Sequence, residues 1–253
     1  MPAPATQTIK AQLIEVFSSI QGEGVLLGCR QAFVRFAECN LDCAYCDTPF
    51  HAGPAYRQET APGSARFADM PNPADLSLLG RTLRDWEKSQ PGWHHSLCLT
   101  GGEPLLHADA LLDWLPSLVD FWPVYLETNG TLPEAFGKIS PYVTWVSMDL
   151  KTEDLTGAPT AWEQHSAFLQ KAGDRLCQVK LIVSEQTQPS VLRQAAALVT
   201  RLAPAVPLVL QPRTVGDRPT LAGQSLLALQ ATAAAIHHDT RLIPQIHPLL
   251  GIA

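Results

Sequence analysis

The segment Cys39-Asn40-Leu41-Asp42-Cys43-Ala44-Tyr45-Cys46 places three cysteines at the spacing C-x-x-x-C-x-x-C, and no fourth cysteine lies nearby. Structural zinc sites use four protein ligands, and simple ferredoxin clusters use four thiolates. Three thiolates on one tight loop suit a cubane iron–sulfur cluster that leaves one iron without a protein ligand. A small molecule can coordinate that iron and receive an electron from it. The spacing therefore predicts chemistry at a cluster rather than a structural metal site.

Zinc is the alternative metal for these thiolates, because soft sulfur ligands select either zinc or iron–sulfur clusters. His51 follows Cys46 by five residues and offers a fourth ligand for a structural zinc knuckle. Disulfides are the other use of the six cysteines in the chain. The N-terminal residues lack an apolar signal core, so we expect a cytoplasmic protein, in which metal ligation is favoured over disulfides.

The bulk composition predicts one domain over residues 1–253, because 46% of the residues are hydrophobic and mean hydropathy is near zero. The net charge of −6 without a basic run argues against nucleic-acid binding. No apolar run is long enough to cross a bilayer. Residues 1–10, rich in Pro, Ala, Thr and Gln, are expected to be a disordered tail.

Apolar runs alternate with helical patterns along the chain, which is typical of βα units around a parallel sheet. The pattern falls short of a full barrel, in which each of eight parallel strands is followed by a helix. The prediction is therefore an α/β fold, an incomplete (β/α) barrel with outer helices. Residues 49–74, rich in Pro, Gly and Ala, are predicted to be a long loop inserted after the cysteines. Strands are predicted at 11–17, 31–37, 96–100, 124–127, 143–150, 177–183, 208–210 and 241–246, and helices at 75–90, 108–120, 161–172, 190–202 and 221–237.

Polar residues gather at the predicted carboxyl ends of the strands, the edge that carries active sites in barrels and open α/β sheets. The cysteine loop also follows a strand end. These residues are Glu103, Glu127, Asn129, Asp149, Lys151 and Gln211.

Two glycine-rich segments lie near this edge. In Thr100-Gly101-Gly102-Glu103-Pro104 the glycines allow a ligand to approach the backbone, and Glu103 can accept hydrogen bonds from an ammonium group. Gln21-Gly22-Glu23-Gly24 is not a dinucleotide fingerprint, because the third glycine, Gly28, comes one residue late. A hairpin turn explains its glycines, and Asn129-Gly130 is a second turn signal.

Histidines give a weaker signal. The pairs His94-His95 and His237-His238 are expected at the surface, whereas His247 ends the last predicted strand and is the better functional candidate.

With these residues in view, the cysteine triplet together with Gly101-Gly102-Glu103-Pro104 resembles the radical S-adenosylmethionine (SAM) enzymes. Further segments are similar to the 7-carboxy-7-deazaguanine synthase family, in the same order and over nearly the whole chain. The family often has glycine where this chain has Glu38. The matching segments are Ser19–Gly24, Phe33–Ala37, Cys46–Thr48, Glu127–Gly130, Gln211-Pro212 and Pro244–His247.

The resemblance implies a carbon–nitrogen lyase with three cofactors: a 4Fe–4S cluster, SAM and Mg²⁺. One electron from the cluster would cleave SAM to methionine and a 5′-deoxyadenosyl radical. That radical would take a hydrogen atom from 6-carboxy-5,6,7,8-tetrahydropterin. Ring contraction and loss of ammonia would then give 7-carboxy-7-deazaguanine, a precursor of 7-deazapurines such as queuosine.

The resemblance also implies site residues and partners. Cys39, Cys43 and Cys46 would hold the cluster and Thr48 the magnesium ion. An electron donor such as flavodoxin or ferredoxin and a homodimer are expected. The SAM site would comprise Tyr45, Cys46, Asp47, Gly101, Gly102, Glu103, Asn129, Ser147, Lys151 and Gln211. The pterin site would comprise Ile20, Gln21, Gly22, Glu23, Arg35, Thr100 and His247.

Two alternatives stay open. Another radical SAM enzyme, such as a glycyl-radical-enzyme activase, would share the cluster but dock a protein partner. A non-enzymatic iron–sulfur or zinc protein would share only the cysteines.

Overall fold

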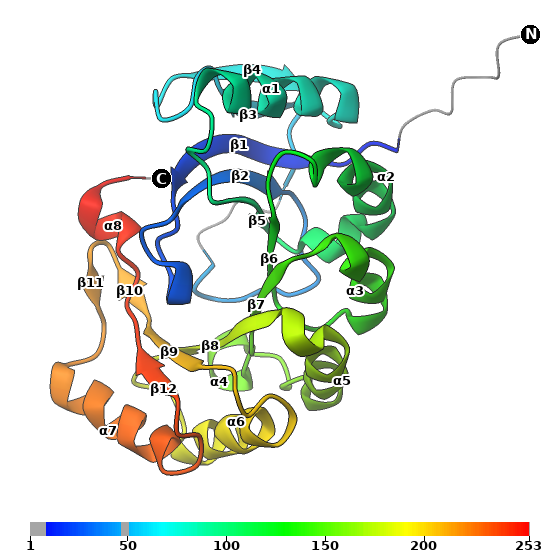
Figure 1. The fold of residues 1–253 in the computed structure, drawn as a ribbon. Coiled ribbons are helices and arrows are strands. Elements are labelled where there is room, and N and C mark those ends of the chain that lie inside the picture. Colours follow the sequence, from blue (N-terminus) through cyan, green and yellow to red (C-terminus); the bar gives the residue numbers. More distant parts are fainter. Residues whose placement is uncertain (1–8, 47–50, 253) are drawn as a thin grey trace, which may run out of the picture.

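One curved sheet organises the described part of the chain, with strand order β12-β9-β8-β7-β6-β5-β2-β1-β3-β4 (Figure 1). The structure is a computed structural model that describes residues 9–46 and 51–252. A small separate ribbon pairs β10 (Thr214–Val215) with β11 (Arg218–Pro219). The strands of the large sheet are β1 (Leu13–Ile20), β2 (Arg30–Phe36), β3 (Ala55–Glu59), β4 (Phe67–Pro71), β5 (Ser96–Gly101), β6 (Val124–Thr128), β7 (Trp145–Asp149), β8 (Leu176–Val183), β9 (Leu208–Pro212) and β12 (Thr240–Leu242).

The strands from β2 through β5, β6, β7, β8 and β9 to β12 run parallel to their neighbours. β1 precedes them as an antiparallel partner of β2. Among the described strands, no pairing joins β12 at one end of the sheet to β4 at the other, so the curved sheet stays open. The prediction of an α/β fold with an incomplete barrel is therefore confirmed.

Helices cover the convex side of the curve, as Figure 1 shows for α2, α3, α5, α6 and α7. The five predicted helices are present, and α3 was not predicted because it is short. Each of the longer helices follows a strand and returns the chain to the start of the next one. The α-helices are α1 (Leu76–Ser89), α2 (Ala108–Leu118), α3 (Pro133–Ile139), α4 (Glu153–Thr156), α5 (Trp162–Ala172), α6 (Pro189–Leu202), α7 (Gly223–Ala234) and α8 (His247–Leu250).

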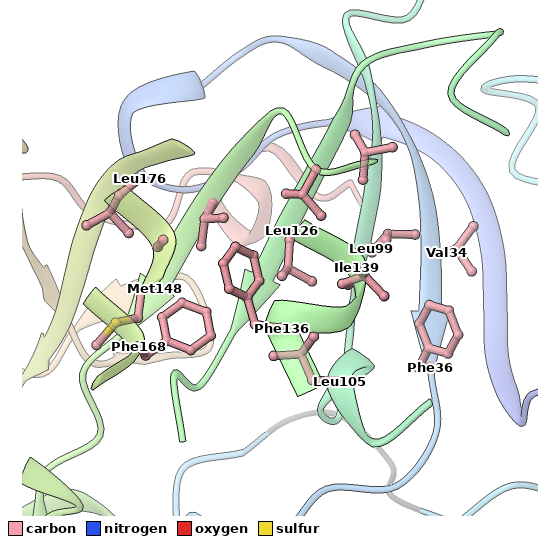
Figure 2. Close-up of a cluster of buried hydrophobic side chains, with 14 of the residues drawn as sticks. Val34, Phe36, Leu99, Leu105, Leu126, Phe136, Ile139, Met148, Phe168 and Leu176 are labelled. Atoms are coloured by element: carbon pink, nitrogen blue, oxygen red, sulfur yellow. The ribbon is translucent and has the colours of Figure 1, made fainter. Parts of the chain in front are cut away.

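The main core lies between the sheet and this layer of helices. Phe136 of α3 and Phe168 of α5 are buried with ring centroids 4.9 Å apart, and they pack near Leu126 of the sheet (Figure 2). A smaller cluster fills the concave side, where Phe17 and Phe33 stack at 4.9 Å beside Cys98 and Tyr125. The two clusters use alternate residues of the same strands, because successive side chains of a strand point to opposite faces.

The prediction of an unbroken loop over residues 49–74 is wrong, because β3 and β4 lie within it and extend the sheet beyond β1. Neither strand has an apolar run, and Tyr56 is the one buried apolar side chain between them. A buried carboxylate orders this hairpin: Glu59 accepts hydrogen bonds from the backbone N–H groups of Ser18 (2.9 Å), Gly63 (3.1 Å) and Ala65 (2.7 Å).

Two smaller expectations also change, and a third is not tested. The last strand is shorter than predicted, so His247 begins α8 rather than ending a strand. His94 and His237 are buried, not at the surface, and their ring nitrogens pair with Ser18 Oγ at 2.7 Å and the Val206 carbonyl at 2.9 Å. Of residues 1–10, only Ile9 and Lys10 are described, so the expected disordered tail lies almost wholly outside the described residues.

The cysteine loop leaves the end of β2 and is held against the end of β5 by backbone hydrogen bonds. The N–H of Gly102 donates to the carbonyl of Phe36 at 3.0 Å, and the N–H of Glu103 donates to the carbonyl of Glu38 at 2.8 Å. Glu38 has a φ of 65°, a left-handed conformation that favours glycine. This agrees with the resemblance, in which glycine is frequent at that position.

A side chain at Gly102 would collide with this contact. A Cβ atom there would lie 1.8 Å from the carbonyl oxygen of Glu38, which is a backbone atom and cannot swing away. We expect Gly102→Ala to displace the cysteine loop and to lower the free energy of unfolding by at least about 1–3 kcal/mol, the usual cost of overpacking. Urea unfolding of the purified variant measures this loss.

Gly223→Ala is the matched control, because no atom lies within 4 Å of the added Cβ. It should leave the free energy of unfolding unchanged or slightly higher. Equal stability of the two variants would contradict the packing described for Gly102.

Candidate active site

The site begins with a link between three loops, made by Glu103. Its carboxylate is fully buried and accepts hydrogen bonds from Leu105 N at 3.0 Å, Thr128 Oγ1 at 2.9 Å and Asn129 N at 2.7 Å. Its own N–H holds the cysteine loop through Glu38. Burial raises the pKa of Glu103 to about 7. Through these hydrogen bonds, Glu103 holds the carboxyl ends of β5 and β6 and the cysteine loop together.

The inner faces of the strands share one pattern, in which a bulky or neutral residue is followed two positions later by a polar one. Phe33 precedes Arg35 on β2, Cys98 precedes Thr100 on β5, and Tyr125 precedes Glu127 on β6. Because side chains alternate along a strand, the polar member of each pair lies above the inner apolar cluster, at the carboxyl end. Ser147 with Asp149 and Gln178 with Lys180 continue the pattern on β7 and β8.

These polar side chains and the cysteine loop enclose one cavity of about 270 Å³. All three cysteines of the triplet line it. The predicted SAM residues that line it are Tyr45, Cys46, Gly101, Gly102, Asn129, Lys151 and Gln211, and the predicted pterin residues are Ile20, Gln21, Gly22, Glu23, Arg35, Thr100 and His247.

The remaining predicted residues do not line the cavity. Glu103 is fully buried among its hydrogen-bond partners Leu105, Thr128 and Asn129, and Ser147 is buried with its hydroxyl 2.7 Å from Gln178 Nε2. Asp47 and Thr48 lie outside the described residues.

A row of alternating charges forms one wall of the cavity. Lys180 forms an ion pair with Glu23 and lies 3.1 Å from Asp149 Oδ1, and Asp149 Oδ2 lies 2.8 Å from Lys151 Nζ. The Lys151 ammonium also donates to the hydroxyl of Tyr45 at 3.0 Å. Burial alone would lower the pKa of Lys151, but Asp149 and Tyr45 together outweigh it and hold that pKa well above its usual range.

A second polar network includes Glu127, which sequence reasoning placed at this edge but gave no role. Its carboxylate accepts hydrogen bonds from Thr100 Oγ1 at 2.6 Å and from Gln21 Nε2 at 2.8 Å. Burial, together with the nearby Glu23 charge, raises the pKa of Glu127. Two of the predicted pterin residues, Gln21 and Thr100, thus share one half-buried carboxylate.

Lys180 and Arg213 of the cavity wall were not predicted as site residues, and Gln245 was named only within the matching segment Pro244–His247. Lys180 sits within the apolar run Cys177-Gln178-Val179-Lys180-Leu181-Ile182-Val183. Its alternation with Gln178 is the signal that could have revealed it, because two polar residues at a spacing of two mark one face of a strand.

Burial raises the pKa of the Cys39 and Cys43 thiols, which favours their protonated form when no metal is bound. Metal binding would displace those protons. In residues 9–46 and 51–252, no three His, Cys, Asp or Glu side chains converge tightly enough to hold a single metal ion. A cubane cluster has no such requirement, because each thiolate binds a different iron. His51, the proposed fourth zinc ligand, is exposed.

Lys180 offers a test of the charged wall. Burial alone would raise the pKa of Glu23, but the Lys180 charge and hydrogen bond, with help from Gln245, lower it to about 2. Lys180→Met would leave the Glu23 carboxylate buried without its ammonium partner. We expect the free energy of unfolding at pH 7 to fall by about 3–5 kcal/mol, and the double variant Lys180→Met/Glu23→Gln to recover much of the loss, both measured by urea unfolding.

The same pair predicts a pH dependence. Because folding lowers the pKa of Glu23 from 4.5 to about 2, its contribution is present above pH 4.5 and is lost as pH falls toward 2. The difference in unfolding free energy between the original chain and Lys180→Met should therefore shrink below pH 4.5. A difference that stays constant from pH 7 to pH 3 would contradict the assignment of this ion pair.

Known proteins resemble this chain over nearly its whole length. Residues 34–157 match the radical SAM superfamily. The 7-carboxy-7-deazaguanine synthase of Geobacter sulfurreducens is 41% identical over 245 residues, which cover 95% of this chain and 97% of that protein. The enzyme of the same name from Archaeoglobus fulgidus is 33% identical, with coverage of 96% and 100%.

A solved structure agrees with the fold. The crystal structure of QueE from Escherichia coli superposes with a TM-score of 0.61 at 20% identity, covering 93% of this chain and 94% of that one. No helix of the described residues is both long and apolar enough to span a membrane. The length and identity of the matches, on a fold with three cysteines facing a polar cavity, show that this chain belongs to the 7-carboxy-7-deazaguanine synthase family of radical SAM enzymes.

Proposed function

We propose that this chain converts 6-carboxy-5,6,7,8-tetrahydropterin to 7-carboxy-7-deazaguanine by radical ring contraction with loss of ammonia. One observation carries the proposal: the cysteine loop and the polar ends of the strands open into the same cavity. A cofactor held by the cysteines and a polar substrate held by the strands would therefore meet there. Membership in the family supports the choice of substrate.

Cys39, Cys43 and Cys46 are the proposed ligands of a 4Fe–4S cluster. The donor set fits, because soft thiolates select such clusters and a triplet leaves one iron open to SAM. When bound, the cluster and SAM supply the 5′-deoxyadenosyl radical that abstracts a hydrogen atom from the substrate. The protein contributes position and a surrounding from which water is largely excluded.

SAM is proposed to lie along the cysteine side of the cavity. Gln211 lines the cavity, and its buried Oε1 has no hydrogen-bond partner among the described residues. Lys151 and Tyr45, joined at 3.0 Å, offer a cation and an aromatic ring beside the cysteines. The backbone of Gly101 and Gly102 allows close approach.

The pterin is proposed to lie across the β1, β2 and β5 side. Arg35 is suited to its carboxylate, because the guanidinium fork binds carboxylates bidentately. Glu15 holds Arg35 Nε at 2.9 Å and so orients the fork. Gln21 and Thr100, both fixed by Glu127, present amide and hydroxyl groups to the heterocycle.

The remaining partners rest on the family resemblance. Mg²⁺ prefers hard oxygen ligands and keeps several waters or substrate oxygens, so the Thr48 hydroxyl can suffice as the ligand from the protein. We also propose a flavodoxin or ferredoxin as electron donor, a homodimer, a cytoplasmic location, and a product that enters 7-deazapurine (queuosine) synthesis.

Anaerobic turnover tests the proposal. Reconstituted protein is incubated with SAM, reductant, Mg²⁺ and the tetrahydropterin, and products are identified by mass spectrometry. We expect both 7-carboxy-7-deazaguanine and 5′-deoxyadenosine. Cys43→Ala should lose the cluster and all turnover, because it removes a proposed iron ligand. Cys29→Ala is the matched control, since this cysteine lies outside the triplet and should keep cluster and turnover.

The outcomes separate the alternatives. Deoxyadenosine without the deazaguanine would indicate another radical SAM enzyme with a different substrate. A colourless protein that binds zinc and forms neither product would indicate a metal-binding protein, and full turnover by Cys43→Ala would overturn the cluster assignment.

A further inference from the structure

Asn129, at the end of β6, is fixed at every polar atom by the protein. Its N–H donates to Glu103 Oε2 at 2.7 Å, and its side-chain oxygen accepts from Thr131 Oγ1 at 2.6 Å and Thr131 N at 3.0 Å. Its side-chain nitrogen donates to Asn40 Oδ1 at 2.8 Å and points its second N–H at Cys39 Sγ, 3.9 Å away. This arrangement directs one amide N–H at a proposed cluster ligand.

His165 completes the arrangement from the helix layer. The imidazole extends inward from α5, is fully buried, and places Nε2 3.1 Å from the carbonyl oxygen of Asn129. A carbonyl can only accept, so Nε2 carries the proton and donates. The other nitrogen, Nδ1, is buried and has no hydrogen-bond partner among the described residues.

Burial of this imidazole lowers the stability of the fold, because Nδ1 loses its hydrogen bond to water and gains no partner. Burial lowers the pKa of His165 to about 4, so the ring is neutral at pH 7 and keeps this donor geometry. The function described above gives His165 no role, and it does not line the cavity. Its hydrogen bond to Asn129 is the contact that explains a polar ring at this position.

We propose that the side-chain amide of Asn129 donates a hydrogen bond to the Cys39 thiolate of the cluster, and that His165 is the positioning residue that aims it. This inference rests on the proposed cluster ligation. Hydrogen bonds to the sulfur atoms of a cluster stabilise its reduced, more negative state and so raise the reduction potential. Residues that hydrogen-bond to a metal ligand without touching the metal also tune the properties of metal sites. The role proposed for Asn129 is therefore to tune the cluster rather than to bind SAM.

The test is an EPR-monitored redox titration of the anaerobically reconstituted protein without SAM. Four variants are compared: Asn129→Ala, His165→Phe, His165→Gln and His94→Phe. Asn129→Ala should make reduction about tenfold less favourable, which is a shift of about 59 mV to lower potential for one electron. His165→Phe should shift the potential in the same direction by a smaller amount, and His165→Gln should restore much of it because its amide can donate to the Asn129 carbonyl.

His94→Phe is the matched control, because His94 is also a buried imidazole whose pKa burial lowers to about 4. It lies before β5, at the end of the strands opposite to the cysteine loop, and pairs with Ser18. It should lose stability without a change in potential. If it shifts the potential as much as His165→Phe does, the effect is a general loss of packing and the proposal is wrong.

Iron content is measured first, so that the two proposals fail separately. If the original chain assembles no cluster, the proposed function fails. If the cluster assembles and Asn129→Ala keeps the original potential, the inference fails while the function stands. If Asn129→Ala loses SAM affinity without a change in reduction potential, the inference is also wrong, and Asn129 contacts SAM instead. Should His165→Phe not fold, Asn129→Ala and His165→Gln still decide the question.

Discussion

The backbone contact between Glu38 and the Gly102-Glu103 segment is the constraint on which the rest of the site depends. It joins the end of β2 to the end of β5, and it requires a residue without a Cβ at position 102. The buried Glu103 carboxylate then carries the connection to the β6 end through Thr128 and Asn129. A flexible cysteine loop becomes a fixed wall of the cavity, because it is tied to strands that the core holds in place.

One face of the parallel strands packs in the core and stabilises the fold, and the other face carries the residues of the cavity. Leu99 and Leu126 pack outward against the helices, whereas Thr100 and Glu127 face the cavity one residue later. Below them, Phe33 and Tyr125 close the inner face with an apolar layer. The cavity therefore has a hydrophobic floor and a charged wall, which keeps its ion pairs partly shielded from water and strengthens them.

Much of the fold and the site could be predicted, because both depend on local patterns. The sequence shows the alternation of strands and helices. It also shows polar residues at the strand ends, as the placement of Lys151 and Gln211 illustrates. The β3–β4 hairpin was not legible, because it has no apolar run and is ordered by the buried Glu59 carboxylate, which bonds Gly63 and Ala65 of its own turn and the distant Ser18. Glu103 was predicted as a ligand contact, and the sequence did not show that its carboxylate bonds Thr128 Oγ1 and Asn129 N, which only the fold brings near. The same applies to Lys180 and His165, whose roles depend on neighbours far away in sequence.

We propose that the three thiolates would hold a cluster with one iron left open to SAM. Mössbauer spectroscopy of ⁵⁷Fe-reconstituted protein, with and without SAM, tests it most directly. We expect a 4Fe–4S spectrum in which the signal of one iron site alone changes when SAM is added. A spectrum in which no site responds to SAM, or a protein that takes up zinc in place of iron, would contradict it.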